Sequence, residues 1–248
     1  MEILPNISII GLALHFDSVL VISDVHIGYE ESLNRQGILV PRTQFGDIAK
    51  SIGDLFEKLG SGRVQTIVVN GDLKHEFGTV SEQEWRNVLK FIDLLASRCN
   101  SLVLIKGNHD AILEPIAKKR NVQVAEYYKA KLSPDSLKSI LITHGNKLPG
   151  REALKKVDTI IIGHEHPAIS IKEGPRIEKF KCFLKGKYKG LNLIVQPSFN
   201  TMIEGTDVMK DDSMGPFLPK DMGDFEVFAV EDKTYYFGKL GSFKTKYF

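Results

Sequence analysis

The segment DTIIIGHEHP, residues 158–167, decides both the fold and the chemistry expected of this chain. The run DTIII is short and apolar, which is typical of a buried β-strand. His164 and His166 follow it at once. Because side chains two positions apart on an extended backbone share a face, we expect both histidines to be able to reach one ion.

The same arrangement, an apolar run followed by polar side chains, occurs at four earlier places. Apolar runs at 18–22, 64–69, 101–105 and 138–143 are followed by SDVHIG, NGDLKHEFG, KGNHD and HGN. These segments contain Asp24, His26, Asp72, His75, Asn108, His109, Asp110 and His144. In an open α/β sheet, ligands bind at the carboxyl ends of the strands. We therefore expect five strand ends to converge on one site.

Each segment taken alone has an ordinary structural explanation. Gly-Asp is common in turns, and an Asp-x-His pair can cap an element or lie on the surface. Five such segments at five successive strand ends are not explained in this way. We interpret the remaining histidine, His15, and the two cysteines as structural.

The order of elements predicts an α/β fold. Helices are expected at 43–59 and 85–97, the second after a capping-box pattern at Ser81 and Glu84. After residue 120 strands dominate, with hairpins expected at 177–196 and 225–238 and a loop at 205–224. We expect two stacked mixed β-sheets flanked by helices, with the site at the carboxyl ends of strands. Residues 1–248 are expected to form one domain that includes the C-terminal hairpins, about 179–248.

Composition sets broad limits on location and partners. The 248 residues have a formal net charge of +2, so bulk charge indicates no particular partner. Two isolated cysteines, Cys99 and Cys182, suggest a reducing compartment. The N-terminus lacks a basic region followed by an apolar stretch, and no run is long enough to span a membrane. We expect a cytoplasmic protein with no membrane partner.

The chemistry of the candidate ligands indicates the metal. Carboxylate, amide oxygen and imidazole without thiolate suit manganese, iron or zinc. The ligands outnumber what one ion needs, whereas two ions that share Asp72 would use them all. Paired ions of this kind lie roughly 3.5–4 Å apart. We expect two divalent ions, manganese first, with iron, zinc, nickel or cobalt as the alternatives.

Five segments resemble the signature blocks of the calcineurin-like metallophosphoesterases: SDVHIG, NGDLKHE, KGNHD, THG and GHEHP, between residues 23 and 167. GYEESLNRQGILVPRTQ (28–44) and PSFNTMIEGTDV (197–208) resemble the ICC-like subgroup, which is related to repair nucleases of the SbcD type. Some bacterial members of that subgroup are described as ligase-associated DNA-repair phosphoesterases.

The resemblance implies a role for each candidate ligand. Asp24, His26 and His166 would hold the first ion. Asn108, His144 and His164 would hold the second, with Asp72 as the bridge. A hydroxide between the ions would attack phosphorus in line, with His109 near the leaving oxygen. One position departs from the pattern, because His75 stands where many relatives have an aspartate that orients the catalytic histidine. Asp110 or Glu76 could orient His109 instead.

The expected activity is hydrolysis of phosphodiesters by a dinuclear phosphoesterase, with a nuclease linked to nucleic-acid repair or processing as the leading form. The substrate would be a phosphodiester, DNA or RNA included. One alternative is a phosphomonoesterase that acts on a small molecule or a phosphoprotein. Another is a binding scaffold without catalysis.

Two further segments are candidates for substrate contact. Arg35 or Arg42 is expected to approach the substrate phosphate, since a guanidinium suits that geometry; the alternative is a solvated loop and helix start. In strand 179–189 the lysines share one face and Phe180, Leu184 and Tyr188 the other. Those lysines either face solvent and protect an edge strand or contact a phosphate backbone.

Overall fold

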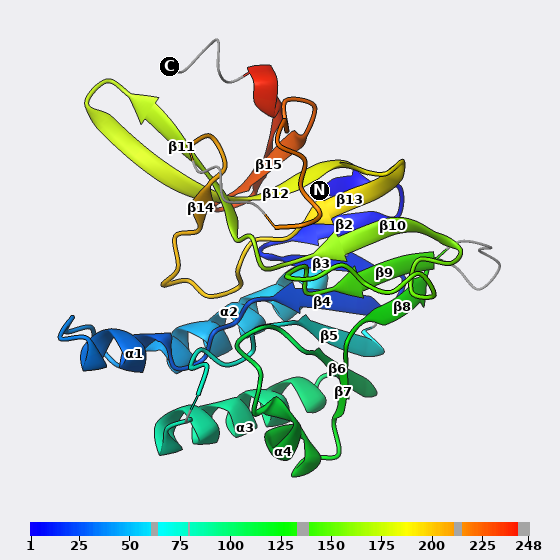
Figure 1. The fold of residues 1–248 in the computed structure, drawn as a ribbon. Coiled ribbons are helices and arrows are strands. Elements are labelled where there is room, and N and C mark those ends of the chain that lie inside the picture. Colours follow the sequence, from blue (N-terminus) through cyan, green and yellow to red (C-terminus); the bar gives the residue numbers. More distant parts are fainter. Residues whose placement is uncertain (61–63, 79, 133–138, 211–214, 243–248) are drawn as a thin grey trace.

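The computed structural model describes residues 1–60, 64–78, 80–132, 139–210 and 215–242. Two β-sheets pack face to face, and helices cover the outer side of the first sheet (Figure 1). The predicted α/β fold of two stacked mixed sheets flanked by helices is confirmed.

The first sheet runs in chain order from β1 to β7. Its strands are β1 (Glu2–Leu4), β2 (Ile7–Ile10), β3 (Ala13–Phe16), β4 (Val19–Ser23), β5 (Thr66–Asn70), β6 (Ser101–Ile105) and β7 (Gln123–Ala125). Strands β1 to β4 are antiparallel, whereas β4 to β7 are parallel. Strands β1, β2 and β3 were not predicted, because strands of three or four residues between turns give little periodicity.

Helices connect the parallel strands of the first sheet. They are α1 (Tyr29–Arg35), α2 (Gln44–Leu59), α3 (Glu82–Ala96) and α4 (Leu113–Lys118), and a short 3-10 helix spans Leu240–Ser242 near the C-terminus. The helices predicted at 43–59 and 85–97 correspond to α2 and α3. The spacing of Ile48, Ile52 and Leu55 buries one face of α2 against the sheet.

The second sheet contains the C-terminal half of the chain. Its order is β14 (Thr206–Asp207), β11 (Pro167–Glu173), β12 (Arg176–Tyr188), β13 (Leu191–Val195), β10 (Val157–Ile162), β9 (Ser139–Thr143) and β8 (Tyr128–Lys131), with β15 (Glu226–Val230) paired to β12 and β16 (Thr234–Lys239) to β15. Strands β9, β10 and β13 are parallel. Both predicted hairpins form, and hairpin β11–β12 extends from the body (Figure 1).

Three apolar layers hold the fold together. The first lies between the helices and the first sheet, the second between the two sheets, and the third on the outer face of the second sheet. Alternation along β5 shows the division, because Ile67 and Val69 face the helices and Val68 faces the second sheet. Strands buried on both faces appear in the sequence as continuous apolar runs.

Two expectations concern the C-terminal part. In the predicted loop 205–224, the described residues contain β14 and no other helix or strand, and residues 211–214 lie outside the description. No helix in the described ranges is long and apolar enough to cross a membrane. That residues 1–248 form one domain stays a prediction.

Candidate metal centre

The carboxyl ends of five parallel strands meet at the candidate site. β4, β5 and β6 end there from the first sheet, and β9 and β10 from the second. Glycines allow the chains to approach. A Cβ added to Gly163 would lie 2.3 Å from Asp24 Oδ2, and one added to Gly107 would lie 2.1 Å from Asp72 Oδ1. A side chain at Gly163 or Gly107 would collide with a ligand carboxylate, which explains why GHEH and GNHD have glycine at these positions.

The candidate ligands form two groups. Ligand atoms of Asp24, His26 and His166 lie within 4.8 Å of one another, and so do those of Asp72, His144 and His164. His26 Nε2 lies 3.3 Å from His166 Nε2 in the first group. His144 Nε2 lies 3.3 Å from Asp72 Oδ2 in the second.

The two histidines of GHEHP belong to different groups, so the structure does not place both in one set of ligand atoms. Alternation holds only for extended backbone, and His164 and His166 have φ angles of 68° and 46°. Asp24 and His26 also follow their strand in left-handed conformations, with φ of 54° and 47°. They share a group, but strand alternation is not the reason.

Asp72 lies where the two groups meet. Its Oδ2 is 3.8 Å from His26 Nε2 of the first group and 3.3 Å from His144 Nε2 of the second. The amide oxygen Oδ1 of Asn108 lies 3.0 Å from His144 Nε2. The structure thus brings together all seven predicted ligands, and their assignment to individual ions stays a prediction.

The electrostatics keep the carboxylates ionised and one imidazole neutral. Burial opposes ionisation of Asp24, but the neighbouring His166 and His144 outweigh it and hold the pKa of Asp24 below its usual value. Burial, followed by the charge of His166, lowers the pKa of His26 to about 3. Burial would lower the pKa of His144, but its hydrogen bond to Asp72 and the charge of Asp24 raise it to about 9.

These residues are suited to divalent cations. Asp24 Oδ1 and His144 Nδ1 are buried and make no hydrogen bond within the described ranges. Asp24 Oδ1 lies 3.5 Å from His144 Nδ1 and 3.4 Å from His166 Nε2. Buried polar atoms normally have a hydrogen-bond partner, and a cation bound to Asp24 would supply a closer one. Carboxylate, imidazole and amide oxygen without thiolate also match manganese, iron or zinc.

His109 lies beside the two groups. Its backbone N–H donates to Asp72 Oδ1 at 2.8 Å, and its Nε2 lies 3.9 Å from Asp72 Oδ2. Its Nδ1–H donates to the backbone carbonyl of His75. This bond fixes the ring and leaves Nε2 on the side of the candidate ligands. A backbone carbonyl therefore does what an aspartate was expected to do.

The other candidates for orienting His109 have different partners. The Asp110 carboxylate is buried and accepts hydrogen bonds from the backbone N–H groups of Gly107, Leu73 and Lys74. Burial and the charge of Asp72 raise its pKa to about 6. Asp110 therefore joins the two loops that carry Asp72 and Asn108. The Glu76 carboxylate lies 3.7 Å from Arg35.

The His75 ring packs among the histidines of the site. Its Nδ1 is 3.4 Å from His26 Nδ1, and its ring stacks on that of His109 with centroids 5.4 Å apart. Burial and the charge of His109 lower the pKa of His75 to about 4. His26, His75 and His109 also form a third cluster of ligand atoms within 4.8 Å.

The loop after β13 holds the backbone of Asp24 and His26 in place, a role that was not predicted from the sequence. Ser198 Oγ donates to the carbonyl of Asp24 at 2.6 Å. Asn200 Nδ2 donates to the carbonyl of His26 at 3.4 Å, and Gln44 Nε2 donates to the same carbonyl at 2.8 Å. The signal was present, because LNLIV at 191–195 is a sixth apolar run followed by polar residues.

Lys181 is half-buried, and its ammonium group has partners within the protein. Its Nζ donates to the carbonyl of Ser198 at 2.8 Å and to that of Asn200. Lys181 shares its strand face with Phe183, which packs between the two sheets. This face of β12 is interior where the strand passes behind the ligand loops. Burial lowers the pKa of Lys181 to about 7, against the opposing effect of Asp24.

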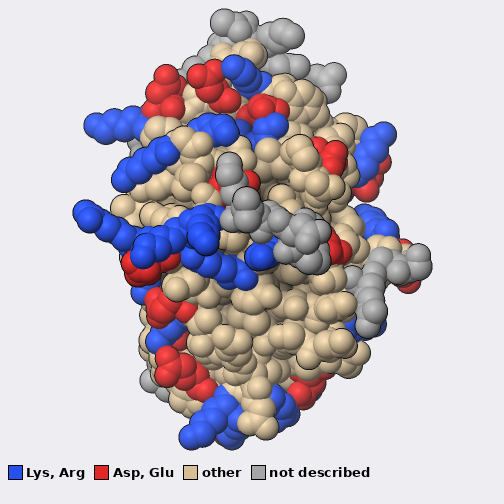
Figure 2. All heavy atoms as spheres, turned by 90° about the vertical axis from the view of Figure 1, so that its right-hand side faces the viewer, with Lys and Arg blue, Asp and Glu red and all other residues tan. Residues whose placement is uncertain are grey.

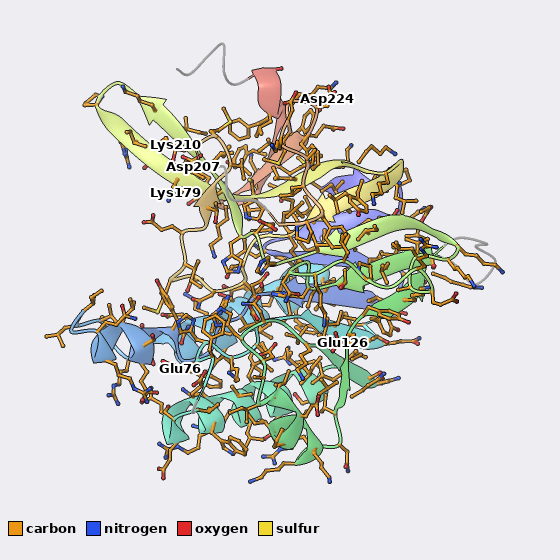
Figure 3. The ribbon with its side chains drawn as sticks, in the orientation of Figure 1. Glu76, Glu126, Lys179, Asp207, Lys210 and Asp224 are labelled. Carbon is orange, nitrogen blue, oxygen red and sulfur yellow. The ribbon has the colours of Figure 1, made fainter. Side chains whose placement is uncertain are left out.

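The other lysines of this strand have partners at the surface. Lys179 lies 3.4 Å from Glu204, Lys185 lies 2.8 Å from Glu226, and Lys187 donates to Asn192 at 2.6 Å. Figure 3 labels Lys179 beside Asp207 near the base of hairpin β11–β12. On the molecular face away from α1, basic side chains are interspersed with acidic ones (Figure 2). Lysine and arginine side chains gather most densely in a band across the middle of that face (Figure 2).

The two predicted arginines lie near the site on α1 and the loop after it. Arg35 Nη2 is 3.1 Å from Glu31, and Arg35 Nη1 is 3.7 Å from Glu76. Arg42 donates to Gln83 Oε1 at 2.9 Å. Both guanidinium groups have partners in this chain. Their contact with substrate stays a prediction.

Comparison with known proteins identifies the family. A model of the calcineurin-like phosphoesterases matches residues 18–168, which include all five ligand-bearing strand ends. Nuclease MPE from Pseudomonas putida has a similar fold, with a TM-score of 0.59 and 15% identity over 92% of this chain and 93% of that chain. Protein AQ665 from Aquifex aeolicus has a TM-score of 0.40 and 21% identity over 60% of this chain and 78% of that one. No curated protein sequence matches the chain. The chain therefore belongs to the calcineurin-like phosphoesterase family and is a metal-dependent phosphoesterase.

Proposed function

We propose that the protein hydrolyses phosphodiester bonds in nucleic acid by means of two divalent cations. The observation that carries this proposal is the position of Asp72. One oxygen of its carboxylate faces His26 in the first group of ligands and His144 in the second. A single carboxylate between two complete sets of ligands is the arrangement that a two-metal hydrolase requires.

The proposed chemistry divides between the cations and the chain. When bound, the cations lower the pKa of water toward ~7 and neutralise the charge that develops on the phosphate oxygens. His109 Nδ1–H is held by the carbonyl of His75, so Nε2 is the atom that would pass a proton to the leaving oxygen. Such general acid assistance typically contributes ~10²–10⁴-fold to the rate. Ser198 and Asn200 hold the backbone of the first ligand segment in place.

Nucleic acid is proposed as the substrate class on two supports. Residues 28–44 and 197–208 resemble the subgroup related to repair nucleases. The second segment contains Ser198 and Asn200, so part of that resemblance lies at the site. The similar fold with a TM-score of 0.59 belongs to a protein described as a nuclease.

The proposal also covers the identity of the metal and the location of the protein. Manganese is the first candidate metal because the ligands are carboxylate, amide and imidazole. A cytoplasmic location stays a prediction, and the free thiols of Cys99 and Cys182 agree with it.

A substrate panel tests the proposal. Protein stripped with EDTA and reloaded with Mn(II) is assayed on an oligonucleotide, a chromogenic diester and a chromogenic monoester. We expect hydrolysis of both diesters that depends on metal and is lost in Asp72→Asn. Asp54→Asn, which changes an exposed carboxylate on α2, should behave as wild type. A preference for the monoester would favour the phosphomonoesterase, and no hydrolysis of any substrate would favour the binding scaffold.

A further inference from the structure

Phe77 is an exposed aromatic side chain in contact with the site. It is 60% exposed, and its ring centroid lies 3.6 Å from that of His109 with an interplanar angle of 32°. Four aromatic side chains are markedly exposed in the described residues: Phe77, Tyr127, Tyr235 and Tyr236. Of these, Phe77 has a ring contact with a residue of the candidate site. Single exposed apolar residues are ordinary, but an exposed ring in contact with the proposed general acid lies where a bound substrate could reach it.

The backbone leading to Phe77 is fixed by helix α3. Glu84 Oε1 accepts hydrogen bonds from the N–H groups of His75 at 2.8 Å and Glu76 at 3.1 Å. Ser81 Oγ accepts from Glu84 N at 3.0 Å, so the predicted capping box is half formed. The Glu84 carboxylate therefore binds the loop at His75 and Glu76 instead of the N-terminus of its own helix.

Two more contacts hold Glu76, the residue before Phe77. The Lys74 ammonium donates to the carbonyl of Glu76, and Arg35 of α1 lies 3.7 Å from the Glu76 carboxylate. Figure 3 shows Glu76 between α1 and α3. The residue before Phe77 is therefore anchored to both helices, which makes the ring part of a positioned loop.

We propose that Phe77 forms a stacking subsite for the nucleobase of the leaving nucleoside. This inference rests on the proposed diesterase function. If His109 donates a proton to the leaving oxygen, the leaving nucleoside extends from His109 toward its neighbour, which is Phe77. A nucleobase on the exposed part of the ring would remove apolar surface from water. Base–aromatic stacking is sequence-tolerant, because every base has a π-face.

The chemistry of the ring distinguishes this ligand from other esters. Phosphoserine, phosphothreonine or an aliphatic diester offers no flat ring to cover Phe77. A nucleotide offers both the phosphate for the metal centre and the base for the ring. The subsite would therefore favour nucleoside diesters over aliphatic phosphate esters without selecting a particular base.

Dinucleotide analogues provide the test. The substrates are dithymidylate, an analogue without the base on the leaving nucleoside, and one without the base on the other nucleoside. In the Mn(II)-loaded wild type, we expect loss of the leaving base to lower kcat/KM at least about 5-fold, the lower end of the stacking range. In Phe77→Leu that difference should vanish, and in Phe77→Trp it should persist. Removal of the other base should affect wild type and Phe77→Leu equally.

The controls separate the possible outcomes. Tyr236→Leu removes a comparably exposed ring on β16, and it should retain the wild-type response. An equal loss on all three substrates in Phe77→Leu would mean that the ring only orients His109, which overturns the subsite. Unchanged kinetics would overturn it as well. A wild type that hydrolyses no diester overturns the proposed function and the subsite together, whereas hydrolysis without dependence on the leaving base overturns the subsite alone.

Discussion

Ser198→Ala tests the loop that supports the first group of ligands. The Ser198 side chain is fully enclosed, with the residue 1% exposed. Its Oγ donates to the carbonyl of Asp24 at 2.6 Å and accepts from Asn200 N at 3.1 Å. Alanine removes both hydrogen bonds and leaves two buried backbone groups without this partner.

The magnitude follows from those two groups. A buried polar group left unsatisfied costs about 1–3 kcal/mol, so for two groups we expect the free energy of unfolding of the metal-free protein to fall by roughly 2–6 kcal/mol. Because the bond also positions the backbone of Asp24, metal affinity should fall by about 10–100-fold, as for other groups that orient ligands.

Urea denaturation in EDTA measures the first effect, and titration of stripped protein with Mn(II) measures the second. Ser51→Ala is the matched control, because Ser51 Oγ donates to the carbonyl of Asp47 on the exposed side of α2. Its effect on stability should stay within about 0.5 kcal/mol, with metal affinity unchanged. Wild-type stability and metal affinity in Ser198→Ala would refute the supporting role of this loop.

Further predictions concern the histidines and the arginines. His109→Ala should retain metal, and its rate loss should be larger for alkoxide than for nitrophenolate leaving groups; an equal loss would assign His109 to charge stabilisation. Burial and His109 lower the pKa of His75 to about 4, and burial lowers that of His26 to about 3. The unfolded chain therefore takes up protons below about pH 6.5 that the folded, metal-free chain does not, so stability should fall as pH drops from 6.5 toward 4. Denaturation in EDTA should show a shallower fall in His75→Asn, and an identical slope would contradict the shifted pKa. Arg35→Ala should raise KM for diesters if Arg35 leaves its acidic partners for the phosphate, with Arg42→Ala as the comparison; unchanged kinetics in both would leave them structural.

The fold and the candidate ligands could be predicted because apolar runs carry strong local signals. A parallel strand buried on both faces appears as a continuous apolar run, such as SLVLI at 101–105. The residue after such a run lies at the carboxyl edge of the sheet, so the order of the segments revealed the site.

The failures all involve information that is not local. The division of His164 and His166 between two groups depends on left-handed backbone angles, which alternation does not describe. The position of the Lys181 ammonium depends on the backbone carbonyls of Ser198 and Asn200, which lie 17 and 19 residues away in the sequence. The hydrogen bond between His109 and the carbonyl of His75 involves a backbone atom, which every residue type has, so the sequence could not predict it.

The ratio of bound metal to protein tests the central claim most directly. Wild-type protein is stripped, reloaded with Mn(II), freed of excess metal and measured by elemental analysis. The position of Asp72 Oδ2 between His26 and His144 predicts two ions per chain, with both sites depleted in Asp72→Asn. A single ion in the fully active wild type, or two ions retained in Asp72→Asn at the normal rate, would contradict a dinuclear centre that shares this carboxylate.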